Sequence, residues 1–247
     1  MANIILETKQ LSKQFEGLVA IDEVSISFSE GELTAMIGPN GAGKTTFFNL
    51  ITGNTQPTGG RIMFKGNDIT HLDPERIAQM GLVQSYQVSN FFKGLSVFEN
   101  IRVATQINHN HYDIWNRAEE LEELNRRAES ILRRVDLSER RDTLAKNLSH
   151  GEQRTLDIAI ALGTDPDFLL LDEPSSGMSP EETTAIIKLI SKLSNDQLIL
   201  LIEHKMDVVM QLVNRIVVLH NGSIIADDSP AKVRDSKQVQ RVYLGGG

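Results

Sequence analysis

The stretch Gly38-Pro39-Asn40-Gly41-Ala42-Gly43-Lys44-Thr45-Thr46 matches the pattern G-x-x-x-x-G-K-[ST], in which a glycine-rich loop holds a chain of phosphates. An apolar run, residues 33–37, precedes it and predicts a buried strand. Residues 45–52 follow it with a helical pattern that Gly53 would end. A strand, a glycine-rich loop and a helix in this order are the context that the pattern requires.

The residue types of this loop suit the binding of phosphate. Glycines let the backbone N–H groups curl around a phosphate chain, and the start of the helix adds partial positive charge. Lys44 is expected to reach the β- and γ-phosphates, and the Thr45 hydroxyl to ligate Mg²⁺. A glycine-rich turn that binds nothing is the alternative, and the flanking elements argue against it. We therefore predict that the loop from Gly38 to Thr46 binds a nucleoside triphosphate.

Composition narrows the class of protein. The chain has 247 residues, of which 40% are hydrophobic, enough for one large α/β domain with a sizeable core. Its formal charge is 25 − 33 = −8, which argues against a general nucleic-acid binder. The chain has no cysteine, so it forms no disulfide and has no thiolate nucleophile. No apolar run has the length of a transmembrane helix, and residues 1–7 lack the features of a signal peptide.

The first part of the chain predicts mainly strands. Residues 4–35 alternate apolar and polar side chains, with turn signals at Glu16-Gly17 and Glu30-Gly31, and indicate an antiparallel β layer. Residues 61–66 and 80–86 are further short strand candidates. We expect an α/β fold with a mixed sheet at its core and an N-terminal antiparallel β subdomain.

A helical segment is predicted at about residues 88–165. Ser96 and Glu99 form a capping box at a helix start. Residues 117–135 predict an amphipathic helix. Its buried stripe comprises Leu121, Leu124, Ala128, Ile131, Leu132 and Val135.

The core sequence resumes at residue 166. Residues 168–171 and 198–202 are continuous apolar runs, typical of parallel strands covered on both faces. Ser179-Pro180-Glu181-Glu182 predicts a helix start, and His220-Asn221-Gly222 predicts a hairpin turn. Asp172 and Glu173 end the first apolar run. There Asp172 can hold Mg²⁺ through water, and Glu173 can orient or deprotonate an attacking water.

The order of the motifs resembles the ATP-binding subunits of ABC transporters over nearly the whole chain. After the phosphate loop come Leu148-Ser149-His150-Gly151-Glu152, the strand ending in Asp172-Glu173, and Leu201-Ile202-Glu203-His204. The resemblance implies one ABC ATPase domain, with residues 1–87 and 166–247 as a RecA-like core carrying the β subdomain and residues 88–165 as the helical subdomain. It also implies ATP and Mg²⁺ as ligands.

The resemblance implies roles for further residues. Phe15 stands where the family stacks an aromatic ring on adenine, with a plain core phenylalanine as the alternative. Gln87, preferred over Gln84, matches the glutamine that contacts Mg²⁺ and the attacking water, and His204 matches the switch histidine at the γ-phosphate. Ser149, Gly151 and Glu152 match the signature that binds the nucleotide of the opposite subunit, although His150 replaces a glycine. The stretch 175–179 resembles the dimer-contact loop, with Ser179 where many members have aspartate.

Local motifs resemble those of the ATPases of importers for branched-chain amino acids, urea or short amides. This subgroup implies membrane permease subunits, a second ATPase subunit (a copy of this chain or a paralogue) and, indirectly, an extracytoplasmic solute-binding protein. It places the chain at the cytoplasmic face of the inner membrane, and no nucleic acid is expected.

Several alternatives stay open at this point. The ATPase of lipopolysaccharide export shares some of the local motifs. A soluble ABC ATPase would usually carry a long coiled-coil insertion or a second cassette. A small-molecule kinase would leave the signature unexplained. A metal site at His109 and His111 competes with an exposed loop.

Overall fold

The computed structural model describes residues 3–85, 91–107 and 117–244. Its N-terminal part forms a four-stranded antiparallel sheet in the order β2-β1-β4-β5. These strands are β1 (Ile4–Phe15), β2 (Leu18–Ser29), β4 (Gly59–Phe64) and β5 (Asn67–Asp68). The predicted antiparallel layer is therefore confirmed as far as Ser29.

A second, six-stranded sheet forms the centre of the molecule in the order β10-β9-β3-β8-β7-β6. Strand β10 runs antiparallel to β9, and the other pairings are parallel. The strands are β3 (Leu33–Ile37), β6 (Leu82–Ser85), β7 (Phe168–Asp172), β8 (Leu198–Ile202), β9 (Arg215–His220) and β10 (Ser223–Asp228). The antiparallel layer predicted for residues 4–35 is therefore wrong at residues 33–35, which belong to β3 of the central sheet.

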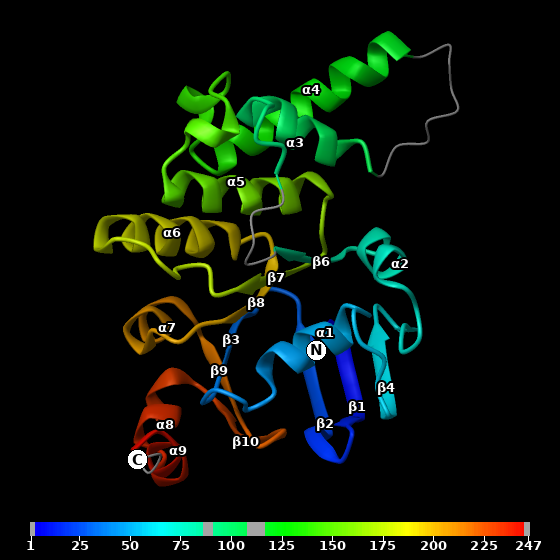
Figure 1. Ribbon diagram of the computed structural model, residues 1–247, viewed down its shortest axis with the longest axis vertical. Helices are drawn as coiled ribbons and strands as arrows, with labels where there is room; N and C mark the ends of the chain where they lie inside the picture. The colour runs from blue at the N-terminus through cyan, green and yellow to red at the C-terminus, as the bar shows by residue number, and fades with distance from the viewer. Residues whose placement is uncertain (1–2, 86–90, 108–116, 245–247) are drawn as a thin grey trace.

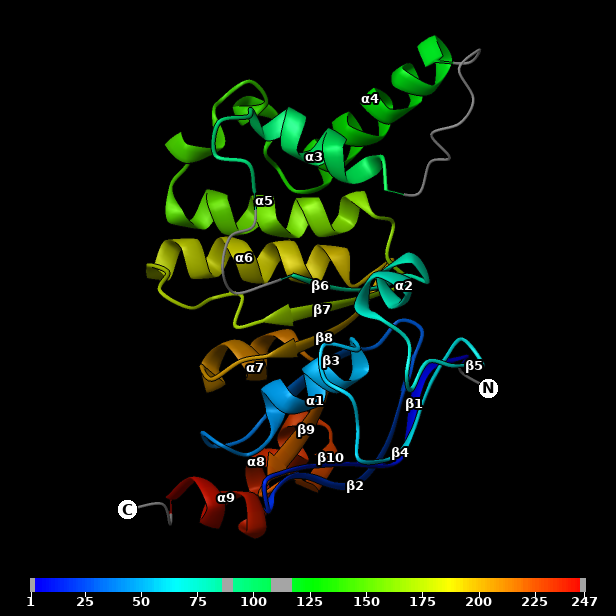
Figure 2. The ribbon, with the colours of Figure 1, turned by 45° about the vertical axis from the view of Figure 1, so that its right-hand side comes forward.

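Helix α1 (Lys44–Ile51) packs between the two sheets (Figure 2). Its buried Phe47 and Phe48 join a core that contains side chains from both sheets and from α2 (Pro74–Gln79). The apolar strands contribute to both faces: Phe168 and Leu170 of β7 point into this core, and Leu169 and Leu171 into the opposite one. Burial on both faces explains why β7 is apolar without alternation.

Helices cover the other face of the central sheet (Figure 1). Helices α5 and α6 lie beside the sheet, α3 and α4 pack beyond α5, and α7, α8 and α9 cover the end near β9. Their bounds are α3 (Val97–Thr105), α4 (Arg117–Arg134), α5 (His150–Gly163), α6 (Pro180–Leu193), α7 (Met206–Leu212), α8 (Pro230–Asp235) and α9 (Lys237–Leu244). Short 3₁₀ turns at Ser138–Arg140 and Ala145–Asn147 connect α4 to α5. None of the helices described has the length and apolarity needed to cross a bilayer.

The predicted helix starts and the hairpin turn are confirmed. Capping boxes begin α3 at Ser96 and α6 at Ser179. Asn221 (φ 48°) and Gly222 (φ 79°) form the turn between β9 and β10. One part of the α4 prediction is wrong: Leu121 is 48% exposed, whereas the other members of the predicted stripe are buried. The N-terminal end of α4 extends past α3 and α5 (Figure 1).

Candidate active site

The phosphate loop follows β3 at the carboxyl end of the central sheet and leads into α1. Its backbone requires glycine at Gly43, where φ is 108° and a Cβ would lie 2.5 Å from the carbonyl oxygen of Ala20. The Gly222 N–H donates to the Ala42 carbonyl at 3.0 Å, which ties the loop to the β9–β10 turn. The β9–β10 hairpin thus holds the phosphate loop in place, a role that was not predicted from the sequence.

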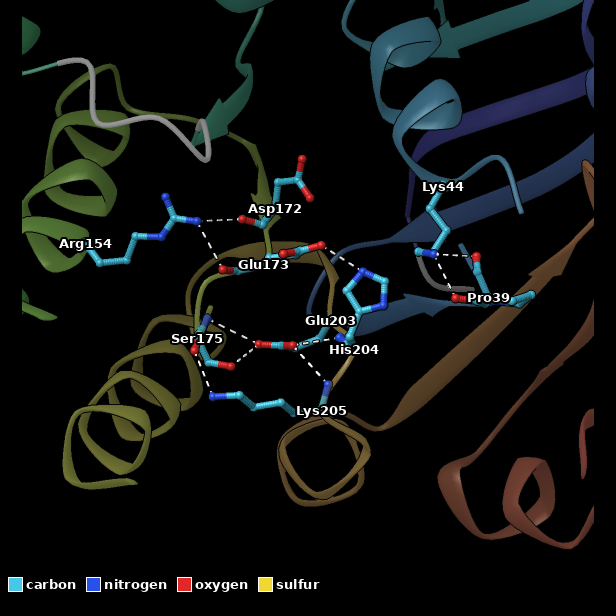
Figure 3. A network of polar contacts seen from close by, with 10 residues as sticks. Pro39, Lys44, Arg154, Asp172, Glu173, Ser175, Glu203, His204 and Lys205 are labelled. Atoms are coloured by element: carbon cyan, nitrogen blue, oxygen red, sulfur yellow. Dashed lines mark hydrogen bonds and ion pairs between the residues drawn. The ribbon is translucent and has the colours of Figure 1, made fainter. Parts of the chain in front are cut away.

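Lys44 is buried at the first position of α1. Its Nζ donates to the carbonyl oxygens of Gly38 at 2.7 Å and Pro39 at 2.9 Å (Figure 3). Burial lowers the pKa of Lys44, and the carboxylates of Glu173 and Asp172 offset part of that effect. An ammonium group held in a poorly solvated loop suits the binding of phosphate oxygens.

A cleft of about 520 Å³ opens beside the loop. The predicted nucleotide-binding residues that line it are Asn40, Gly41, Ala42, Gly43, Lys44, Thr45, Thr46 and Phe15, together with the predicted catalytic residues Glu173 and His204. The structure therefore brings the loop and two of the predicted catalytic residues to one cavity. Gly38 and Pro39 are connected to this cleft through Lys44, whose Nζ donates to both of their carbonyl oxygens.

Phe15 lies at the end of β1, at the outer side of this cleft. Its side chain is 44% exposed, and the Nζ of Lys13 lies 4.7 Å from the centre of its ring. The alternative of a plain core phenylalanine is therefore wrong. An exposed ring on the cleft is available for stacking on a nucleobase.

Asp172 is the last residue of β7 and Glu173 follows it, beside β8, which leads to His204. Arg154, a buried residue of α5, donates from Nη2 to the carbonyl oxygens of Asp172 (2.8 Å) and Glu173 (3.1 Å). Glu173 has a left-handed backbone with φ 47°. Such a conformation persists where neighbouring contacts enforce it. Arg154 therefore helps to fix the direction in which the Glu173 side chain leaves the strand.

His204 follows β8, and its Nε2 lies 2.7 Å from Oε1 of Glu173. Figure 3 shows the Glu173 side chain extending from the end of β7 toward this imidazole. The two side chains come from adjacent strands, so their contact depends on the β7–β8 register that pairs Asp172 with Ile202.

The pKa of Asp172 is raised, first by burial and then by the charge of Glu173. Arg154, His204 and Lys44 act in the opposite direction. When burial disfavours the ionised form of a carboxylate, a nearby cation stabilises that form. This is the electrostatic setting expected for a carboxylate that ligates a metal ion.

The signature residues lie apart from this cleft, at the start of α5. Ser149 and Glu152 form a capping box, and Nε of Arg140 donates to Glu152 at 2.7 Å. The Gly151 N–H donates to Oε1 of Glu182 on α6 at 2.9 Å. These side chains line a separate cavity of about 320 Å³. Ser149, Gly151 and Glu152 therefore do not line the cleft of the phosphate loop in the same subunit.

Two predicted positions lie outside the described residues. One is Gln87, and the other is the pair His109 and His111. Within residues 3–85, 91–107 and 117–244, no cluster of three histidine or acidic side chains could hold a metal ion. Of the adjacent aromatic residues Phe91 and Phe92, the first is buried in the core and the second is 59% exposed.

The loop, the carboxylate pair and the imidazole stand at the carboxyl ends of β3, β7 and β8, which are neighbours in one sheet. Ligands of open α/β sheets bind at this edge. Fold and site together define a P-loop nucleoside triphosphatase.

Comparisons with known proteins narrow this class. The model of the family described as ABC transporter matches residues 21–176. The branched-chain amino acid transport ATP-binding protein BraF of Pseudomonas aeruginosa is 39% identical over 99% of each chain. The lipopolysaccharide export ATP-binding protein LptB of Haemophilus influenzae is 34% identical over 98% of this chain and 97% of its own length. A crystal structure of an ABC-transporter cassette in its ADP conformation superposes with a TM-score of 0.85 at 30% identity, covering 98% of this chain and 99% of the other. The chain belongs to the ATP-binding subunits of ABC transporters, and it is an ATPase.

Proposed function

We propose that this chain powers an importer of branched-chain amino acids or of related small polar solutes such as urea. The observation that carries this proposal is full-length similarity at 38–39% identity to ATPases named for branched-chain amino acid transport. The relative named for lipopolysaccharide export is more distant, at 34%. Solute recognition belongs to other subunits, so the solute class rests on this similarity.

Two ATPase subunits would close head-to-tail around two ATP molecules. Each site would combine the phosphate loop, Asp172, Glu173 and His204 of one subunit with Ser149 and Gly151 of the other. The separation of the two cavities within one chain supports this arrangement. So does the Gly151 N–H, which already takes a carboxylate as acceptor. Because the γ-phosphate would contact both subunits only in the closed state, ATP would favour closure.

Glu173 would act as the base for the attacking water, and His204 would hold its carboxylate through the 2.7 Å contact. Lys44 and the loop N–H groups would position the phosphates and neutralise their charge. Phe15 would stack on the base. Gln87, outside the described residues, would link the attacking water to the membrane subunit.

The residues present fit Mg²⁺ as a cofactor. Magnesium prefers one or two carboxylates, a hydroxyl and phosphate oxygens. Asp172, whose raised pKa marks a carboxylate short of compensating charge, and Thr45 on the cleft supply such ligands, with Gln87 as a third. The ion would neutralise charge on the β- and γ-phosphates.

Permease subunits would anchor the chain at the cytoplasmic face of the membrane, with the exposed Phe92 near the contact. The division into a core of residues 1–87 and 166–247 and a helical subdomain of residues 88–165 is part of this proposal. It is supported by the mutual packing of α3, α4 and α5. A second ATPase subunit, a copy or a paralogue, would complete the pair, and a solute-binding protein would deliver solute on the other side.

Affinity purification of the Glu173→Gln variant from solubilised membranes with Mg·ATP, followed by mass spectrometry, tests this function. Recovery of polytopic permeases together with a solute-binding protein of the amino-acid class would support it. Recovery of lipopolysaccharide-export components would favour a second candidate function, the ATPase of lipopolysaccharide export, which the 34% identical relative supports. Recovery of soluble proteins alone would contradict a transport role.

A further inference from the structure

Glu203 is a buried carboxylate to which the proposed mechanism gives no role. It lies between the last residue of β8 and His204, and only 3% of its surface is exposed. Burying a carboxylate is costly unless hydrogen bonds compensate the lost water. Its surroundings therefore show what this side chain does.

Both oxygens of Glu203 accept hydrogen bonds, and they do so from different loops. Oε1 accepts from the N–H of Ser175 at 3.2 Å and from the Ser175 hydroxyl. Oε2 accepts from the N–H groups of His204 (2.7 Å) and Lys205 (3.2 Å). Nζ of Lys205 returns to the Ser175 carbonyl at 3.0 Å and closes the network (Figure 3).

This network continues the connection between β7 and β8 beyond the end of their ladder. The last paired residues are Asp172 and Ile202, followed by one bond from the Glu173 N–H to the Ile202 carbonyl at 2.9 Å. Past that point, bonds from the side chains of Glu203 and Lys205 join the two segments. The first loop carries Glu173 and, two residues later, Ser175. The second carries His204.

We propose that Glu203 is a positioning residue for ATP hydrolysis. It fastens the backbone of His204 to the loop after β7, so that the imidazole stays on the Glu173 carboxylate 2.7 Å away. Because Ser175 opens the loop of residues 175–179, which resembles a dimer-contact loop, a shift of that loop on subunit closure would reach His204 through Glu203. This inference rests on the proposed roles of Glu173 and His204.

Substitution of Glu203 by glutamine separates charge and hydrogen bonding from size. Glutamine keeps the volume, but its NH₂ group would face N–H donors where a carboxylate oxygen now accepts. The turn that carries His204 should then shift relative to Glu173. We expect kcat to fall about 10- to 100-fold, the scale of effect of an ångström-sized misplacement. The KM for ATP should stay within about 2-fold, because the phosphate loop is not touched.

A double-mutant cycle distinguishes positioning from a general structural role. If Glu203 acts through His204, then E203Q costs little further activity in an H204A background. Single-turnover measurements with excess full-length enzyme follow the residual hydrolysis in these variants. E75Q, the same change at an exposed glutamate of α2, is the matched control and should keep the parent kcat.

The cycle also has a result that overturns the proposal. If E203Q lowers the hydrolysis rate by the same factor in the parent and in the H204A background, Glu203 does not act through the imidazole. A parent kcat in E203Q would lead to the same conclusion. If E203Q fails to fold, S175A removes one donor from the network and enters the same cycle with H204A. If instead H204A and E173Q both keep the parent rate, the proposed roles of those residues fail, which is a separate outcome.

Discussion

Arg154 offers a direct way to test how the end of β7 is held. We predict that Arg154→Met, which keeps an unbranched side chain of similar length but removes the guanidinium, destabilises the protein and slows hydrolysis. The side chain is buried, and its Nη2 donates to the carbonyl oxygens of Asp172 and Glu173.

The magnitude follows from these two bonds. A hydrogen bond from a charged donor contributes about 1.5–3 kcal/mol. The bond to Asp172, at 2.8 Å, should contribute in full. The bond to Glu173 is longer, at 3.1 Å, and its carbonyl also accepts from the Ser176 N–H, so its loss should cost less. A total loss of roughly 2–4 kcal/mol in the free energy of unfolding corresponds to a fall in Tm of roughly 4–16 °C for a chain of this size.

Thermal unfolding without nucleotide or metal measures this effect. Arg140→Met is the matched control, because Arg140 pairs with Glu152 at the surface, where an ion pair contributes at most about 1 kcal/mol. The kcat of Arg154→Met should also fall, since the backbone of Glu173 loses a support. A fall in the Tm of Arg154→Met no larger than that of Arg140→Met, with kcat unchanged, would show that Arg154 does not hold the end of β7.

Three further predictions concern the loop and the carboxylate beside it. Gly43→Ala should lower the free energy of unfolding by roughly 2–4 kcal/mol, because a Cβ would meet the Ala20 carbonyl at a backbone φ of 108°. Urea unfolding should show a smaller loss for Gly41→Ala, because no atom lies within 4 Å of a Cβ at that position. Asp172→Asn should raise the Tm at pH 7, because burial and then Glu173 raise the native pKa of Asp172 and ionisation therefore weakens the folded state. The difference in Tm should shrink as the pH falls through that raised pKa and vanish well below 3.8, where the carboxyl is protonated in both the folded and the unfolded state. A lower Tm for Asp172→Asn at pH 7 would contradict this sign. Lys44→Met should weaken the binding of a fluorescent ATP analogue by about 10- to 100-fold, because one charge-assisted hydrogen bond is lost. An unchanged Kd would show that Lys44 does not bind phosphate.

The central sheet and the phosphate loop could be predicted because their signals are local. Residues 168–171 and 198–202 are apolar without alternation, and the structure buries them on both faces. The helix starts at Ser96 and Ser179 are set by side chains three residues apart, so a short stretch of sequence contains the whole motif.

What the sequence did not indicate depends on contacts between distant segments. The transfer of β3 to the second sheet reflects pairing with β8 and β9, more than 160 residues further along the chain. Helical periodicity places Leu121 on the buried face but does not show where the neighbouring helices end, and this residue is exposed. Glu203 belongs to the motif of residues 201–204 and Arg154 follows that of residues 148–152, yet both bond to residues 172, 173 and 175, which only the fold brings near.

In the proposed dimer, the signature of one subunit completes the cleft of the other. Light scattering of the Glu173→Gln variant tests this arrangement. We predict a species of twice the 27.5 kDa subunit mass with Mg·ATP, return to the single mass with ADP, and negligible turnover. A variant that stays a monomer with ATP, or that hydrolyses ATP at the parent rate, would contradict it.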